Sequence, residues 1–367
     1  MGAAWPSMKT NFGLRLDEVG IYLLVNTVGY TLASFFSGQI AARTGFGRFL
    51  LLGALTFGVG FLGIALAPAW VWVLFFGLFT GLGGGIIDAS LNRFMAARSS
   101  SMLLNWLHAS YGIGATLGPA GLSFLLSIGQ TWRVGFQIMA VLQVVMVGAV
   151  LLSLNRWESS QVGTATAEVI QPTERVSLRE TLAVPAVWLA LGLFFVYTGA
   201  EMTAGQWSYS LFTLGRGISE TTAGWWTSLY WASFTIGRLV LGILIDRFGF
   251  VRSLRVMIAG ALLGAALLWW NPLDGVSFAG LALIGFSFAA VFPTMIAITP
   301  RLLGARQTAN AIGMQVAFGG LGIAILPWLA GILADKINLE VIGPCIIVES
   351  LLLLLFFELL LRKRVTE

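Results

Sequence analysis

Two acidic residues lie inside apolar stretches of this sequence, Asp88 in GIIDASLNRF and Glu201 in VYTGAEMTAGQW. Insertion scales put the cost of a charged side chain at the centre of a membrane at about 2.5–3.5 kcal/mol, so such residues usually face the interior of a helix bundle. Asn92 follows Asp88 by four residues and shares its helical face. A carboxylate beside an amide can bind a proton or a hydroxyl group of a solute. The alternative is that Asp88 lies near the cytoplasmic end of its helix and pairs with Arg93.

Glu201 lies near the middle of its stretch, with a glycine on either side that loosens the helix. Tyr197, Gln206 and Trp207 belong to the same stretch. Carboxylate and amide oxygens accept hydrogen bonds from hydroxyl groups, and an indole face can pack against the C–H face of a sugar ring. These residue types favour a binding site for a polyol, in which Glu201 could also carry a proton. The alternative is that Glu201 bonds to a backbone group that has lost its helical partner where the glycines loosen the helix.

Further candidates lie in other apolar stretches. Asn105 and His108 follow helical spacing in LNWLHASYGIGATLGPAG, and a histidine can titrate near physiological pH. The alternative for His108 is a neutral structural role. Tyr230 and Gln315 are candidates for polar contacts with a solute. Arg238 either neutralises an acid in the core or extends to the cytoplasmic surface. Glu349, in the last apolar stretch, is expected to be structural or lipid-facing, and protonated.

The composition predicts the class of protein that holds these residues. The chain has 367 residues, of which 57% are hydrophobic and 10% charged. A membrane-spanning helix needs about 20 mostly apolar residues, and such runs recur along nearly the whole chain, whereas a β-barrel would show short alternating strands. We therefore expect an all-α polytopic membrane protein.

The sequence argues against catalytic, metal and nucleic-acid chemistry. It has one cysteine, Cys345, and one histidine, which exclude an internal disulfide and a multi-histidine metal site. It has no nucleophile elbow and no phosphate-binding loop. We expect no enzymatic activity, no cofactor, no metal and no nucleic-acid partner, and we attribute the net charge of +5 to membrane topology.

Eleven spans are expected, five before and six after a long polar segment at 155–183. Their ranges are 19–42, 47–67, 70–96, 102–127, 132–154, 184–213, 220–245, 253–271, 276–300, 307–333 and 339–361. Fifteen basic residues then fall on the side that holds the polar segment and the C-terminus, and five on the other side. Because cytoplasmic loops carry excess Lys and Arg, we expect a multi-pass protein of the inner (cytoplasmic) membrane with a cytoplasmic C-terminus.

A motif occurs twice, as GQIAARTGFGR at 38–48 and GILIDRFGFVR at 242–252, with a constant offset of 204 residues. Gly38, Arg43, Gly45 and Arg48 of the first copy match Gly242, Arg247, Gly249 and Arg252 of the second, which also has Asp246. The spacing resembles the loop motif of the major facilitator superfamily, G-x-x-x-D-R-x-G-x-x-R. The first copy has Ala42 at the position of the acid. The resemblance implies two bundles of six helices that work by alternating access, and a gating role for the motif.

The repeat also indicates which helix of such a fold is missing. Only five spans precede the polar segment, and the repeat aligns the span 19–42 with the second helix of its half. The opening GAAWPSMKTNFGL resembles the outer end of a first helix. We therefore expect most of helix 1 to be absent, through a late gene start or a truncation. The predicted organisation is an N-terminal bundle at 1–154, a cytoplasmic linker at 155–183 and a C-terminal bundle at 184–367.

Four stretches, GIIDASLNRF, LNWLHASYGIGATLGP, VYTGAEMTAGQW and FTIGRLVLGILIDRFG, resemble the fucose permease and glucose/galactose symporter branch of that superfamily. The branch carries an acid linked to sugar binding and proton coupling at the position of Asp88, with an asparagine at Asn92. Its helix 5 pattern corresponds to Asn105 and His108. The resemblance implies a secondary transporter of a sugar or similar polyol, with proton coupling through Asp88. We add Glu201 as a second candidate for proton coupling, and we expect a monomer. The rival function is export of amphipathic drugs or lipids, which would favour a large apolar cavity.

Overall fold

The structure is a computed structural model that describes the backbone of residues 1–97, 101–154, 157 and 178–363. Within these ranges the surroundings of some side chains are not described, namely 35, 38, 39, 42, 92–97, 101–109, 111, 178, 242–244, 246, 305, 306 and 309. The described residues form helices and contain no strand, so the predicted all-α class is confirmed.

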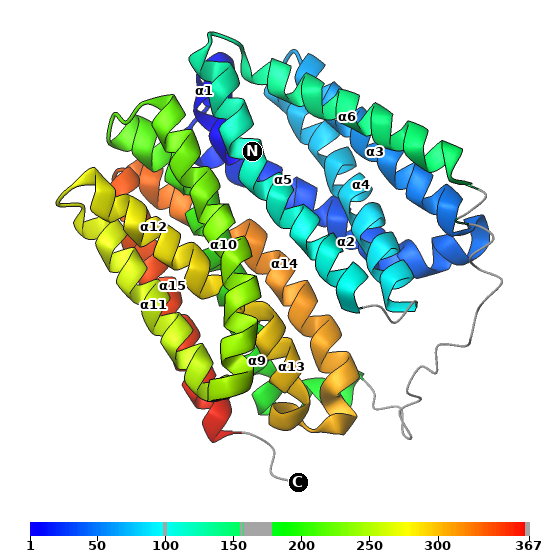
Figure 1. The fold of residues 1–367 in the computed structure, drawn as a ribbon, viewed down its shortest axis with the longest axis vertical. Coiled ribbons are helices and arrows are strands. Elements are labelled where there is room, and N and C mark those ends of the chain that lie inside the picture. Colours follow the sequence, from blue (N-terminus) through cyan, green and yellow to red (C-terminus); the bar gives the residue numbers. More distant parts are fainter. Residues whose placement is uncertain (98–100, 155–156, 158–177, 364–367) are drawn as a thin grey trace.

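The helices follow the apolar stretches of the sequence closely (Figure 1). The first half contains η1 (Gly2–Ala4), α1 (Trp5–Phe12), η2 (Leu16–Glu18), α2 (Val19–Thr44), α3 (Phe46–Leu66), α4 (Trp70–Ala97), α5 (Ser101–Ser127) and α6 (Trp132–Leu152). The second half contains α8 (Leu178–Leu182), α9 (Pro185–Ser210), η3 (Leu211–Gly215), α10 (Glu220–Phe248), α11 (Phe250–Trp270), α12 (Asp274–Phe288), α13 (Val291–Leu303), α14 (Ala305–Lys336), η4 (Leu339–Val341) and α15 (Ile342–Arg362). Among the described residues, eight helical segments are long and apolar enough to cross a membrane; the count of eleven crossings stays a prediction.

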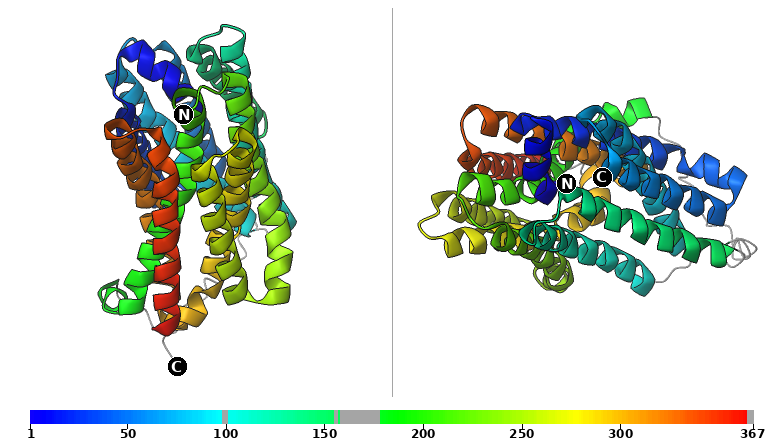
Figure 2. Two further views of the ribbon diagram at one scale, coloured as in Figure 1. Left: turned by 90° about the vertical axis from the view of Figure 1, so that its left-hand side faces the viewer. Right: turned by 90° about the horizontal axis from the view of Figure 1, so that it is seen from above.

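The helices pack in two groups, coloured blue to teal and green to red in Figure 2, and the contacts of α4 in the first group have a counterpart in those of α12 in the second. In the first group α4 packs against α2 and α3, and α3 packs against α6. In the second group α9 packs against α14 and α15, and α12 packs against α10 and α11. The groups meet along two helix pairs, α5 with α10 and α2 with α14.

Glycines in the left-handed region make the tight turns of the repeat. Gly45 joins α2 to α3 with φ 84°, and Gly249 joins α10 to α11 with φ 81°. These are equivalent glycines of the two motif copies, and side chains other than glycine are strained in this conformation. Gly13 and Gly217 have φ 65° and 67° and are also 204 residues apart. The repeat therefore extends beyond the motif to the residues that follow α1 and η3.

The other members of the motif lie around these turns. The side chains of Arg43, Arg48, Arg247 and Arg252 are exposed. The surroundings of Gly38, Gly242 and Asp246 lie outside what the structure describes. The gating role of the motif stays a prediction.

The two groups are joined at the end where α1 lies, at the top of Figure 1. Trp5 is buried, and its indole N–H donates to the Leu16 carbonyl at 3.0 Å. The Leu16 backbone N–H donates to Asp335 Oδ1 at the end of α14, at 3.1 Å. Arg15 adds an ion pair with the same carboxylate at 3.3 Å. The start of α2 is therefore bonded directly to the end of α14.

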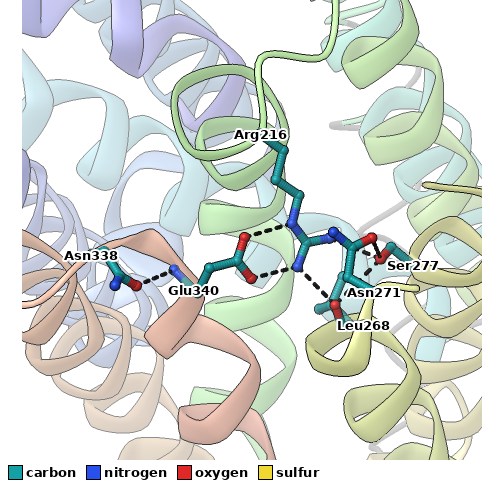
Figure 3. A network of polar contacts seen from close by, with 6 residues as sticks. All are labelled: Arg216, Leu268, Asn271, Ser277, Asn338 and Glu340. Atoms are coloured by element: carbon teal, nitrogen blue, oxygen red, sulfur yellow. Dashed lines mark hydrogen bonds and ion pairs between the residues drawn. The ribbon is translucent and has the colours of Figure 1, made fainter. Parts of the chain in front are cut away.

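A second polar network holds the same end of the second group together (Figure 3). The Arg216 guanidinium donates to both carboxylate oxygens of Glu340, at 2.7 and 2.6 Å. It also donates to Ser277 Oγ and to the Leu268 carbonyl, both at 2.8 Å. Only 5% of the Arg216 side chain is exposed, so this network is a buried clamp between the ends of α9, α11, α12 and η4.

Candidate functional site

A stripe of glycines on α4 sets the position of Asp88. Gly77, Gly81 and Gly85 are spaced by four residues and face α2. A Cβ added at Gly81 would lie 2.0 Å from the Asn26 carbonyl oxygen, and one at Gly85 would lie 2.5 Å from the Tyr30 carbonyl oxygen. Small residues at this spacing allow membrane helices to approach closely. The backbones of α2 and α4 are therefore in contact just before Asp88.

Polar side chains of α2 bond to α4 along this seam. Asn26 Nδ2 donates to Thr80 Oγ1 at 2.9 Å and to the Gly77 carbonyl at 3.2 Å. One turn further along α2, the Tyr30 hydroxyl donates to Asp88 Oδ2 at 2.6 Å. Both Tyr30 and Asp88 are exposed. The Asp88 site is therefore a carboxylate bonded to a phenol and open to its surroundings.

The other predicted members of this site lie outside the described side chains. They are Asn92, Asn105 and His108. The same holds for Arg93, the alternative partner of Asp88. Their contribution stays a prediction.

In the second group, the apolar stretch 276–300 forms two helices, α12 and α13, which are separated at Ala289 and Ala290. Pro293 has no N–H to donate to the carbonyl four residues earlier, that of Ala289. Arg238 Nε donates to this carbonyl at 3.3 Å, and the Tyr197 hydroxyl donates to the Phe288 carbonyl at 3.0 Å. Backbone carbonyls at membrane depth need such partners, so Tyr197 and Arg238 stabilise the break.

The same two residues surround Glu201. The Glu201 carboxyl lies beside the Tyr197 hydroxyl and interacts electrostatically with Arg238. The Tyr230 hydroxyl donates to the Glu201 backbone carbonyl at 2.8 Å. The structure thus places three predicted site residues together, and it places Arg238 beside an acid of the core. We call Tyr197, Glu201, Tyr230 and Arg238 the Glu201 cluster.

Contacts through α14 relate the Asp88 site to the Glu201 cluster. The Thr198 hydroxyl, next to Tyr197 in α9, donates to the Gly319 carbonyl at 2.7 Å. A Cβ added at the next residue, Gly320, would lie 3.9 Å from the side chains of Thr27 and Thr31 in α2. Thr31 is adjacent to Tyr30, the partner of Asp88. Residues of α2 and α9 that are adjacent to members of the two sites therefore border the same segment of α14.

Three other predicted residues lie in the interior. Trp207 is fully buried and donates to the Pro327 carbonyl at 2.7 Å, between α9 and α14. Gln315 is 1% exposed and accepts a bond from Thr299 at 3.2 Å. Gln206 is buried, and its amide nitrogen has no hydrogen-bond partner among the described residues. The structure does not bring these three side chains into the Glu201 cluster.

Sequence reasoning missed Tyr30 and the break between α12 and α13. The break had a signal in Pro293, which removes one helical hydrogen bond. Tyr30 had a weaker signal, because Tyr22, Asn26 and Tyr30 recur every four residues and can form one face of a helix.

Comparisons with known proteins agree with this architecture. The chain is 25% identical over 373 residues to the Bypass of stop codon protein 6 of Saccharomyces cerevisiae, covering 93% of this chain and 75% of the relative. It is 22% identical to the glucose/mannose transporter GlcP of Bacillus subtilis, with 90% and 81% covered. It is 25% identical to the 3-(3-hydroxy-phenyl)propionate transporter of Escherichia coli, also with 90% and 81% covered.

Solved structures show the same fold. A bacterial homologue of the human lysosomal transporter Spinster, inward-facing and unoccupied, matches with a TM-score of 0.79 at 14% identity, covering 100% of this chain and 94% of the other. A D-xylose-proton symporter matches with a TM-score of 0.73 at 14% identity, covering 96% and 92%. The sequence model of the Major Facilitator Superfamily matches residues 1–215 and 189–367. The two matches span the whole chain, and the chain belongs to the Major Facilitator Superfamily.

Proposed function

We propose that the protein is a secondary transporter that moves a sugar or similar polyol across the membrane by alternating access. The observation that carries the proposal is the pair of acidic sites, one in each group of helices, on α4 and α9. Binding sites of secondary transporters usually lie where the halves meet and where a helix is broken. The Glu201 cluster lies at such a break.

The chemistry of these two sites suits a polyhydroxy solute. Asp88 and Glu201 offer carboxylate oxygens that accept hydroxyl protons, and Tyr30 offers a phenol that both donates and accepts. The similarity to a glucose/mannose transporter and the shared fold with a D-xylose-proton symporter support a sugar as substrate. An exporter of amphipathic compounds would need a predominantly apolar site, and both sites are centred on a carboxylate.

We also propose that transport is coupled to protons through Asp88, with Glu201 as the second candidate. Each is a carboxyl group within a transmembrane segment, and alternating access would expose Asp88 to each side in turn. We further propose that the chain works as a monomer with its C-terminus in the cytoplasm, as the basic residues indicate.

A small organic acid is the second candidate substrate, because of Arg238. This guanidinium lies in the Glu201 cluster, where its Nε atom donates to the Ala289 carbonyl. An arginine can bind a carboxylate through two parallel hydrogen bonds, and one relative is named as a hydroxyphenylpropionate transporter.

Binding measurements on the purified protein distinguish the two substrates. Titration with D-glucose, D-mannose and D-xylose, and separately with an arylpropionate, should give saturable binding of a sugar. Glu201→Gln should weaken that binding about 10-fold or more, because hydrogen bonds to charged groups contribute about 1.5–3 kcal/mol. Glu358→Gln is the matched control, since Glu358 pairs with Arg255 far from the cluster. Saturable binding of the arylpropionate alone would favour the organic acid, and sugar binding that is unchanged in Glu201→Gln would remove Glu201 from the site.

A further inference from the structure

Glu349 is a buried acid that the proposed transport site does not use. It lies in α15 with 7% of its surface exposed, at the contact between α15 and α9. The Thr203 hydroxyl of α9 donates to its Oε1 atom at 3.2 Å. Its Oε2 atom is buried and has no hydrogen-bond partner among the described residues. The carboxyl group thus faces the interior, which agrees with the structural alternative for Glu349 and not with the lipid-facing one.

Among the described residues, the positive charge that α11 brings to α15 lies away from Glu349: Arg255 is bonded to Glu358, which is about 13 Å further along α15 by residue spacing. The buried residues of α11, which packs against the same helix, are apolar: Leu254, Met257, Ile258, Ala261, Gly264, Ala265 and Leu268. On α15 itself the nearest groups are Cys345, one turn earlier, and Ser350, whose hydroxyl is buried. From η4 the closest charged residue is Glu340, which is about 13 Å away along the helix axis by residue spacing and is bonded to Arg216. On α14, Asp335 and Lys336 lie at the end of the helix that adjoins η4.

An isolated carboxylate in such surroundings is unstable. Removing an ionised carboxyl from water without a cationic partner costs so much that the group takes up a proton instead. One hydroxyl donor is the only partner that the structure gives Glu349, whereas a stable buried carboxylate accepts several bonds or pairs with a cation. The neutral acid fits the observed contacts, because Oε1 then acts as the carbonyl oxygen that accepts from Thr203.

We propose that Glu349 is a proton-binding site of the second half, separate from the candidate substrate site, and that its proton holds α9 against α15. Loss of the proton would leave a negative charge at the contact between the two helices and weaken it. Thr203 lies two residues after Glu201 in α9. The proton on Glu349 is therefore linked to the position of the helix that carries Glu201. This inference does not rest on the identity of the transported solute.

Infrared spectroscopy of the protein in lipid vesicles, without substrate, tests the proposal. A protonated carboxyl has a C=O stretching band that a carboxylate lacks, and the band moves to lower frequency in D2O. We expect this band at neutral pH in the parent, its loss in Glu349→Gln, and its retention in Ser350→Ala, Asp88→Asn and Glu201→Gln. Thr203→Val should shift the band to higher frequency, because the carbonyl loses its hydrogen-bond donor. A spectrum of Glu349→Gln identical to that of the parent would overturn the assignment.

A second measurement covers the case in which Glu349→Gln does not fold. Parent protein grown with ¹³C-labelled glutamate should show the band at lower frequency, and the Glu201→Gln variant with the same label should keep it. Among the described glutamates, Glu349 alone has less than a tenth of its surface exposed, so these two results together assign the band to it. A band that does not respond to the glutamate label would overturn the proposal.

Discussion

The two halves hold their acids in opposite ways. In the first half, Asp88 is exposed and bonded to Tyr30, at the end of a seam where two helices touch through glycines. In the second half, Glu201 is half-buried beside a phenol and a guanidinium that also stabilise a broken helix. The first site depends on close backbone packing, and the second depends on a polar cluster.

The two arrangements suit different tasks, proton coupling in the first half and recognition of hydroxyl groups in the second. Asp88 is accessible from its surroundings, which suits the coupling role proposed for it. The Glu201 carboxyl is held in a fixed polar setting, beside the Tyr197 hydroxyl and the Arg238 guanidinium. Such a group suits recognition of hydroxyls.

Gly81→Ala should cause the largest loss of stability. The new Cβ would lie 2.0 Å from a backbone oxygen of α2, and overpacking of this kind costs about 1–3 kcal/mol or more. The matched control on the same helix is Gly84→Ala, where the nearest atoms are 4.0 Å away. Thermal unfolding in detergent should show a lower midpoint for Gly81→Ala alone. Equal midpoints for the two variants would mean that the glycine seam does not hold Asp88 in place.

Arg216→Met should destabilise the second half by about 2 kcal/mol. Breaking a buried charge pair costs about 3–5 kcal/mol, and the value is reduced here because 40% of the Glu340 side chain is exposed. Arg15→Met is the comparison, since Arg15 is 61% exposed and exposed pairs contribute about 0–1 kcal/mol. Unfolding midpoints should fall clearly for Arg216→Met and hardly for Arg15→Met. The reverse order would show that the Arg15–Asp335 ion pair between the halves contributes more to stability than the Arg216–Glu340 pair within the second half.

Tyr30→Phe should have the smallest effect, because it removes one hydroxyl and keeps the ring. The lost bond to Asp88 is charge-assisted, and such bonds contribute about 1.5–3 kcal/mol when buried. Both partners are exposed, so we expect a decrease in sugar affinity of about 3-fold to 10-fold, measured as in the substrate titrations. Tyr22→Phe is the control, since its hydroxyl bonds to Thr80 rather than to Asp88. A larger loss in Tyr22→Phe than in Tyr30→Phe would show that the seam, and not the Asp88 site, determines affinity.

Helix positions could be predicted well from the sequence, and side-chain positions could not. The expected span 19–42 corresponds to α2 at Val19–Thr44, and 339–361 corresponds to η4 and α15 at Leu339–Arg362, because apolar length determines where a membrane helix runs. Residue type does not say which side of a helix faces a neighbour. Trp207 was therefore expected to contact solute, and its indole instead bonds to Pro327 in α14. Arg238 had two possible positions, and the choice depended on a helix break that is distant in sequence.

Transport into proteoliposomes by Asp88→Asn tests the central claim most directly. The substitution keeps the size of the side chain and its capacity to accept from Tyr30, and it removes ionisation. With an imposed proton gradient, the parent should accumulate the sugar that it binds, and Asp88→Asn should not accumulate it. Exchange of the same sugar across the membrane without a gradient should remain in both. Full accumulation by Asp88→Asn, with the pH dependence of the parent, would contradict the account and transfer the coupling role to Glu201 or His108.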